Sequence, residues 1–310
     1  LSVPRRGECH GTASRMARLI DAHLHLACDG EAGLQLLEAL DLKVLNISVP
    51  RPGGSRWRAH AAVFRGLAQA HPERFAWIAG FELPTFRPDG VVEDGYAERV
   101  IASLEADLAA GAVGVKIWKS VGMEVRKPSG EYLMVDDPLF HPIYDFLEAR
   151  GTTLLLHTGE PRACWQPLDD PDDPHHGYYR QSPSWHFHGR ADVPSHAQII
   201  AARDHLLEAR PGLRVVGAHL ASLEFDVDEV ARRLERYPNF AVDTSARLLD
   251  LARQDRDKVR AFFARHRERI LFGTDLIDPR PWSSLSAAEV APKVFQAHQR
   301  WSAELAWYGA

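Results

Sequence analysis

Eight short apolar or β-branched stretches recur along this 310-residue chain, and helical patterns of 3.6-residue period lie between them. Several stretches are apolar on both faces, which is typical of parallel strands that helices cover. The stretches are residues 17–26, 43–49, 75–83, 112–118, 152–157, 213–220, 239–244 and 269–275. The clearest helical patterns are 58–70, 98–110, 138–150, 195–209, 227–236 and 247–265.

Strands that alternate with helices eight times in one chain of this length predict an α/β fold, a single-domain (β/α)8 TIM barrel. A doubly wound open sheet has a similar alternation, but usually with fewer strands and often with a glycine-rich first turn. The chain has no GxGxxG motif after the first stretch and no P-loop. We therefore predict a barrel over residues 16–310. The polar residues 1–15 are expected to be a tail or an expression remnant, with Met16 as a candidate start.

Charge and cysteine content exclude several classes of partner. The formal net charge is −5 and the basic residues are dispersed, which argues against nucleic acid. No apolar run approaches the about 18 residues of a membrane span. Three widely spaced cysteines suggest neither a disulfide framework nor a zinc knuckle, and favour a cytoplasmic location. We expect a small-molecule substrate, and the oligomeric state is left open.

One connection is much longer than the others and runs from 158 to 194, after the fifth predicted strand. It is rich in proline, aspartate, histidine and aromatic residues. Loops of this length are normally functional or disordered, and the aromatic residues argue against disorder. In a barrel it would lie on the face that carries active sites, so we predict a lid or pocket wall.

Polar residues end several of the apolar stretches. His23 and His25 lie two apart on the first strand, so their imidazoles point to the same side. His157, His219 and Asp275 end the fifth, sixth and eighth stretches. The carboxyl ends of barrel strands meet at one mouth, where a buried histidine or carboxylate is costly unless it is paired or metal-bound. The pattern therefore predicts a divalent metal site.

These five residues, together with Lys116 near the end of the fourth stretch, resemble the amidohydrolase superfamily. The absence of a flanking β-sandwich domain is similar to its amidohydrolase-2 branch of compact metal-dependent hydrolases and non-oxidative decarboxylases. The resemblance covers about residues 17–300. It indicates a superfamily and not a substrate.

The resemblance implies that His23, His25, His157 and Asp275 are metal ligands, and that Asp275 also accepts a proton from the metal-activated water. It implies that His219 is an acid/base or an electrophile that polarises the substrate. Three imidazoles and a carboxylate would leave a zinc-like ion one open position for water, whose pKa the ion lowers to about 7. We expect one divalent ion, with zinc preferred over manganese, iron or cobalt.

Lys116 has two interpretations under this resemblance. In binuclear relatives the lysine of the fourth strand is carboxylated and bridges two metals, and His157 and His219 would then serve a second ion. We favour a single metal, with Lys116 contacting the substrate or the surroundings of Asp275. Strand parity places Lys119 on the opposite face, which makes it the poorer candidate.

Further candidates for substrate binding are Glu160, Arg162 and Trp185, all in the long connection. Asp243, in the seventh stretch, is a candidate partner for a ligand histidine, because carboxylates commonly fix such histidines.

The favoured function is a metal-dependent hydrolase that uses a metal-activated water to cleave an ester, lactone, amide or related C–N or C–O bond. The alternative is a metal-dependent non-oxidative decarboxylase, a lyase acting on an aromatic or unsaturated carboxylate. An inactive metal-binding barrel is less favoured, because loss of function usually leaves a ligand missing. Sequence alone leaves the substrate open.

Overall fold

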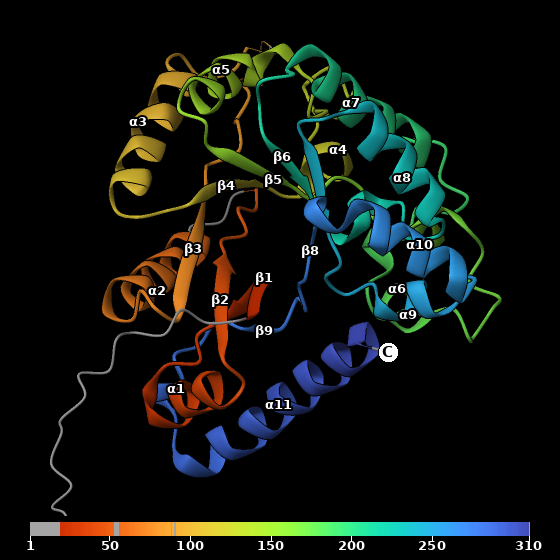
Figure 1. Ribbon diagram of the computed structural model, residues 1–310. Coiled ribbons are helices and arrows are strands. Elements are labelled where there is room, and N and C mark those ends of the chain that lie inside the picture. The colour runs from red at the N-terminus through yellow and green to blue at the C-terminus, as the bar shows by residue number, and fades with distance from the viewer. Residues whose placement is uncertain (1–18, 53–55, 88, 90, 310) are drawn as a thin grey trace, which may run out of the picture.

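The computed structural model describes residues 19–52, 56–87, 89 and 91–309. The predicted tail at 1–15, the candidate start at Met16 and the first residues of the first predicted strand lie outside the described residues. Each of the eight predicted strands has a counterpart, and all neighbouring strands pair in parallel (Figure 1).

The strands follow one another around a curved sheet in the order in which they occur in the chain. Several are shorter than the apolar stretches because the chain leaves the sheet before the stretch ends. Their bounds are β1 Leu19–Leu26, β2 Leu42–Ile47, β3 Phe75–Gly80, β4 Gly114–Ile117, β5 Thr153–Leu156, β6 Val215–Gly217, β7 Phe240–Asp243, β8 Ile270–Leu271 and β9 Ile277–Asp278.

The last strand segment closes the sheet into a (β/α)8 barrel. β8 pairs with β7, whereas β9 pairs with β1. Between these two short strands the chain stays beside β1: Ala22 N donates to Phe272 O at 2.8 Å, and His25 N donates to Leu276 O at 2.8 Å. The ninth strand is therefore the continuation of the eighth, and the first and last strands of the chain lie side by side.

Helices surround the strands (Figure 1). They are α1 Gly30–Ala39, α2 Arg56–Ala70, α3 Tyr96–Ala109, α4 Ser120–Met123, α5 His141–Ala149, α6 His176–Gln181, α7 His196–Ala209, α8 Val227–Arg236, α9 Leu248–Ala252, α10 Arg256–His266 and α11 Ala287–Gly309. No helix in the described part of the chain is both long enough and apolar enough to cross a membrane.

Two predicted segments differ from the structure. The single helix expected over 247–265 is two helices, α9 and α10, because the Asp255 side chain accepts a hydrogen bond from Lys258 N and starts a new helix there. The long connection after β5 is not a plain loop. It contains the 3-10 turns η2 Arg162–Trp165 and η3 Pro183–Trp185 and the short helix α6.

The alternation of side chains along the strands separates two packed regions. Leu154 and Leu156 of β5 join the large cluster between strands and helices. Leu155 packs in a small separate cluster with Ile47 and Ile78 from β2 and β3. Side chains at the same alternate positions as Leu155 face the barrel interior. On β1 these positions are His23 and His25, because Leu24 and Leu26 belong to the large cluster on the other side of the strand.

Candidate metal-binding active site

A cavity of about 950 Å³ lies at the mouth of the barrel. Seven residues predicted from the sequence as site residues line it: His23, His25, Lys116, His157, Glu160, His219 and Asp275. They come from the ends of five strands and from the segments that follow them, as the barrel prediction required.

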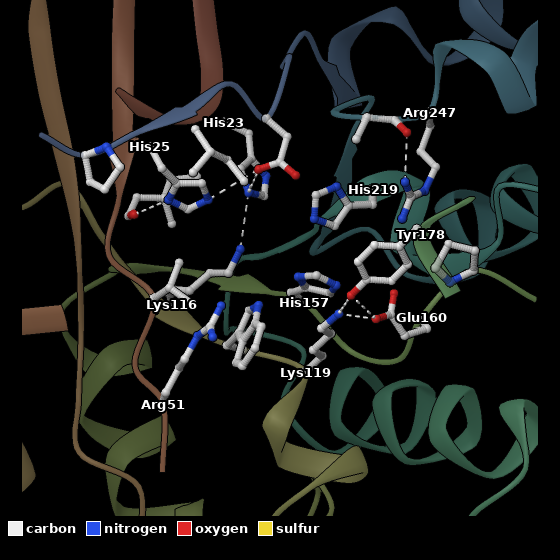
Figure 2. A pocket seen from close by; sticks show the side chains of 18 of the residues that line it. His23, His25, Arg51, Lys116, Lys119, His157, Glu160, Tyr178, His219 and Arg247 are labelled. Atoms are coloured by element: carbon white, nitrogen blue, oxygen red, sulfur yellow. Dashed lines mark hydrogen bonds and ion pairs between the residues drawn. The ribbon is translucent and has the colours of Figure 1, made fainter. Parts of the chain in front are cut away.

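His23 and His25, which Figure 2 shows at the cavity, are both fixed through their Nδ1 atoms. His23 Nδ1 lies 2.7 Å from Asp243 Oδ2, and His25 Nδ1 lies 2.5 Å from the carbonyl oxygen of Ile47. Since both partners are acceptors, each Nδ1 carries the proton and each Nε2 keeps its lone pair. The two Nε2 atoms lie 3.9 and 3.3 Å from Asp275 Oδ1.

Asp275 owes its position to a break between β8 and β9. Its φ is +59°, a left-handed conformation that interrupts the strand. Its backbone N still donates to His23 O at 2.8 Å. Burial tends to raise the pKa of Asp275, but the hydrogen bond with His25 and the electrostatic contribution of the surrounding histidine side chains outweigh it. The pKa therefore lies far below its usual value, and the side chain is a carboxylate.

His157 and His219 lie against each other, with ring centroids 4.3 Å apart. His157 Nε2 is buried and has no hydrogen-bond partner among the described residues. His219 Nδ1 lies 2.9 Å from Ser245 O, which makes Nδ1 the protonated nitrogen. Burial lowers the pKa of both histidines well below the usual value, so both rings are neutral.

Asp243 and Ser245 fix the positions of His23 and His219 through hydrogen bonds. Asp243 Oδ2 accepts from His23, and Oδ1 accepts from the backbone N of His219 at 2.9 Å. Ser245 Oγ donates to Asp243 Oδ1 at 2.5 Å. His23, His219 and Asp243 are close enough to form a metal-binding group by distance alone. Because both Asp243 oxygens already accept hydrogen bonds, this group is better explained as a hydrogen-bond network.

The chain leaves β6 through a left-handed turn, η4 His219–Ser222, in which all four residues have φ between +54° and +59°. Such a conformation costs roughly 1–2 kcal/mol for each residue other than glycine. Side chains of neighbouring segments hold the turn. Arg203, which is fully buried, donates to Ala221 O at 2.5 Å, and Ser222 Oγ donates to Thr158 O at 2.6 Å. Strained backbone of this kind is frequent at functional sites.

Lys116 reaches the histidines from β4. Its Nζ lies 3.3 Å from His23 Nε2, and the side chain is buried. Burial lowers its pKa to about 8. Lys116 therefore faces the same centre as the histidines, as the sequence predicted.

The prediction for Lys119 is wrong. β4 ends at Ile117, and Lys119 itself has helical backbone angles, so strand parity no longer applies to it. Lys119 points into the cavity and pairs with Glu160, and its Nζ donates to Tyr178 Oη at 3.0 Å (Figure 2). Tyr178 in turn donates to Glu160 Oε1 at 3.2 Å. These three residues form a closed cluster at the side of the cavity.

Two predicted substrate-binding residues do not line the cavity. Arg162 begins the turn η2 after Pro161, and its guanidinium lies over the ring of Phe225 at 4.8 Å, in an exposed position. Trp185 does not line the cavity, and its ring centroid lies 5.5 Å from that of Trp118, which does. The chain forms 3-10 turns at both places, and the direction of such turns cannot be predicted from sequence.

The sequence did not predict the three arginines that line the cavity, Arg51, Arg56 and Arg247, and two of them follow strand ends. Arg51 follows β2 and lies 4.4 Å over the ring of Trp118. Arg247 follows β7 and is only 6% exposed. Both come shortly after a strand end, which is the position that predicted the histidines. A search of the few residues beyond each strand end would have found them.

The donor set fits a divalent cation. Nε2 atoms of His23 and His25 and a carboxylate oxygen of Asp275 lie within 4.8 Å of one another. The unpartnered Nε2 of His157 is buried at the same cavity and adds a third imidazole. Neutral imidazoles and a carboxylate are ligands that zinc and similar ions accept.

Comparisons with known proteins agree on the family and the fold. A family model described as Amidohydrolase matches residues 20–305. No curated protein matches the sequence. A solved structure of an amidohydrolase II is 16% identical, with a TM-score of 0.50 over 86% of this chain and 89% of that chain.

Two further solved structures are enzymes of different reaction types. A 2,6-dihydroxybenzoate decarboxylase from Rhizobium is 17% identical, with a TM-score of 0.49 over 90% of this chain and 98% of that chain. A dihydroorotase from Campylobacter jejuni is 14% identical, with a TM-score of 0.45 over 83% and 69%. Likeness at this level of identity concerns the fold and not the reaction.

Proposed function

The chain belongs to the amidohydrolase family, and from this premise we propose that it is a metal-dependent hydrolase of a small molecule. One observation carries the proposal: the Nε2 atoms of His23 and His25 and a carboxylate oxygen of Asp275 lie within 4.8 Å of one another, and the unpartnered Nε2 of His157 is buried at the same cavity. The Nδ1 atoms of His23 and His25 are occupied by Asp243 and Ile47 O, which leaves their Nε2 atoms as the ligand atoms.

We propose that His23, His25, His157 and Asp275 hold one divalent ion, with zinc preferred. Such an ion polarises the bond to be cleaved and lowers the pKa of a water to about 7. The preference for one ion rests on the second close group, His23, His219 and Asp243, in which both Asp243 oxygens already accept hydrogen bonds. A cytoplasmic location stays a prediction from the cysteine content.

Asp275 is the residue placed to accept a proton from the attacking water. Its low pKa keeps it ionised at neutral pH, and its Oδ1 is anchored between the two histidines. His219 is neutral with a proton on Nδ1, so its Nε2 is a hydrogen-bond acceptor. This supports a role in moving the proton to the leaving group, in place of the electrophile that the resemblance also allowed.

Elemental analysis of the purified protein tests this proposal. We expect about one divalent ion per chain, because the donor set is that of a mononuclear site. His23→Ala and Asp275→Asn should each lose the ion and lower turnover at least about a hundredfold. His205→Ala removes an exposed histidine of α7 and should change neither. A wild-type protein that binds no ion after reconstitution would overturn the proposal.

A decarboxylase is the second candidate, and the basic lining of the cavity favours it, because Arg51, Lys116 and Arg247 suit a carboxylate substrate. Isotopes separate the two reactions. In ¹⁸O-labelled water, hydrolysis places ¹⁸O in the product. In D₂O, decarboxylation releases CO₂ and places deuterium on the carbon that lost it. We expect ¹⁸O in the product of the best ester, lactone or amide substrate.

A further inference from the structure

We propose that Arg247 binds a carboxylate of the substrate, so that this cavity takes anionic molecules with an apolar body. The inference rests on the proposed function, because it assigns the substrate class of that same site. Arg247 is not one of the proposed metal ligands and comes from the segment that follows β7. The carboxylate that we propose for it is one that the reaction leaves intact.

Arg247 has more donor capacity than the described residues use. The side chain lines the cavity and is buried. Only Nη1 makes a hydrogen bond, to the adjacent Ala246 O at 2.8 Å. Nε is buried with no partner, and Nη2 donates to no described residue. Nε and Nη2 form one edge of the guanidinium, a planar pair of donors that matches the two oxygens of a carboxylate.

Arg247 forms no ion pair with a carboxylate of the described residues. Glu224 is near enough to feel its charge: burial raises the pKa of Glu224, and Arg247 opposes that rise. The two side chains nevertheless form no ion pair, and Glu224 does not line the cavity. Asp250 pairs with His175 at 2.9 Å, and Glu160 pairs with Lys119. A buried cation without a partner is costly, and an anionic ligand removes that cost.

The lining of the whole cavity is positively charged, as Arg247 is. Five basic side chains but only three carboxylates line it, and the carboxylates of Glu160, Asp250 and Asp275 each have a partner. Arg51 lies over the ring of Trp118 and makes no ion pair with a described carboxylate. A divalent ion adds further positive charge, so the cavity attracts an anion.

Apolar side chains form another part of the lining. Leu249 and Ile277, which are 63% and 69% exposed, lie where the cavity opens to solvent, and the buried Trp57 and Phe64 add aromatic surface. Arg247 lies beside His219 (Figure 2) and belongs to the cationic part of the lining. A ligand that satisfies both parts has its carboxylate at Arg247 and an aryl or alkyl body directed to the rim.

Matched ligands test the proposal without turnover. Binding of benzoate and of neutral benzamide is measured by calorimetry on the metal-loaded protein. We expect benzoate to bind at least about tenfold more tightly, and Arg247→Met to remove that preference while benzamide binding stays the same. Arg253→Met, which removes an exposed arginine outside the cavity, is the matched control. We also expect 4-butylbenzoate to bind more tightly than benzoate, and Leu249→Asn to reduce this gain.

Arg247→Lys is a control for misfolding of Arg247→Met, because it keeps the positive charge but loses the planar pair of donors. We expect its affinity for benzoate to lie between those of the wild type and Arg247→Met. Benzoate that binds Arg247→Met as tightly as wild type would overturn the proposal, since the metal or another cation would then hold the carboxylate. Tighter binding of phenyl phosphate than benzoate would also overturn it. If the proposed function fails, the protein binds no metal. Benzoate binding that depends on Arg247 can persist in that case, so the two failures are distinguishable.

Discussion

The two sides of the cavity use polar side chains in opposite ways. On the metal side, formed by His23, His25 and Asp275, each histidine is fixed through Nδ1 and leaves Nε2 facing the centre. In the closed cluster, Lys119, Glu160 and Tyr178 satisfy one another. The metal side is built on β1 and the segment that pairs with it. The closed cluster joins the segments after β4 and β5 to α6.

This difference distinguishes residues whose donor atoms are available to a ligand from residues that stabilise the wall of the cavity. A buried histidine nitrogen without a partner is costly, and an ion would remove that cost. A buried ion pair with a third hydrogen-bonding group is already complete, and its loss affects the fold first. The following predictions test this division.

The largest expected effect is on stability, from breaking the closed cluster. Lys119→Met leaves the Glu160 carboxylate buried without its cation and should lower the free energy of unfolding by about 3–5 kcal/mol in urea denaturation. The double variant with Glu160→Gln should recover most of this loss. Metal content should stay at the wild-type level in both. A loss of metal in Lys119→Met would show that the two sides are not separate.

Asp243→Asn tests the support of the metal side. It removes the charged acceptor for His23 Nδ1, and we expect the metal dissociation constant to rise about 10- to 100-fold. Asp136→Asn is the matched control, because Asp136 accepts from His205 at 2.8 Å in an exposed pair outside the cavity. Equal metal affinity in both variants would contradict the assigned role of Asp243.

Gly273→Ala tests the close approach of β1 to the last strand segment. A Cβ at this position would lie 2.9 Å from His23 Cβ, so one of the two strands must shift. We expect a loss of about 2 kcal/mol in stability together with weaker metal binding. Gly66→Ala is the control: a Cβ there, in α2, would contact nothing, and the substitution should slightly stabilise the helix. Unchanged metal affinity in Gly273→Ala would indicate that the site tolerates movement of His23.

The smallest expected effect is that of Arg162→Ala. Its guanidinium lies over Phe225 and outside the cavity, so KM for any substrate should change less than about twofold. A larger rise in KM, in steady-state kinetics, would return Arg162 to the substrate-binding residues that the sequence predicted.

The strand-end residues could be predicted because strand geometry is periodic. His23 and His25 share a face through their spacing alone, and closure of a parallel barrel brings His157, His219 and Asp275 to the same mouth. Lys116 follows from the same rule. All six of these residues line the one cavity.

Residues beyond the strand ends could not be placed in this way. Lys119 follows β4 by only two residues, yet a change of backbone angles reverses its direction. Arg162 was expected at the mouth and lies elsewhere, because a 3-10 turn starts at that residue. Arg247 lies four residues past Asp243, after Ala246 in a left-handed conformation. Non-glycine residues in that conformation carry little sequence signal, so the direction of the chain after them is hidden.

The pairing of the first strand with the last segment has a consequence for protein synthesis. His23 leaves the ribosome long before Asp275 and the segment that closes the barrel. The ligand set cannot assemble until both have emerged. The proposed metal centre can therefore form only after residue 275 has been synthesised, and a nascent chain that ends earlier would be unable to form it.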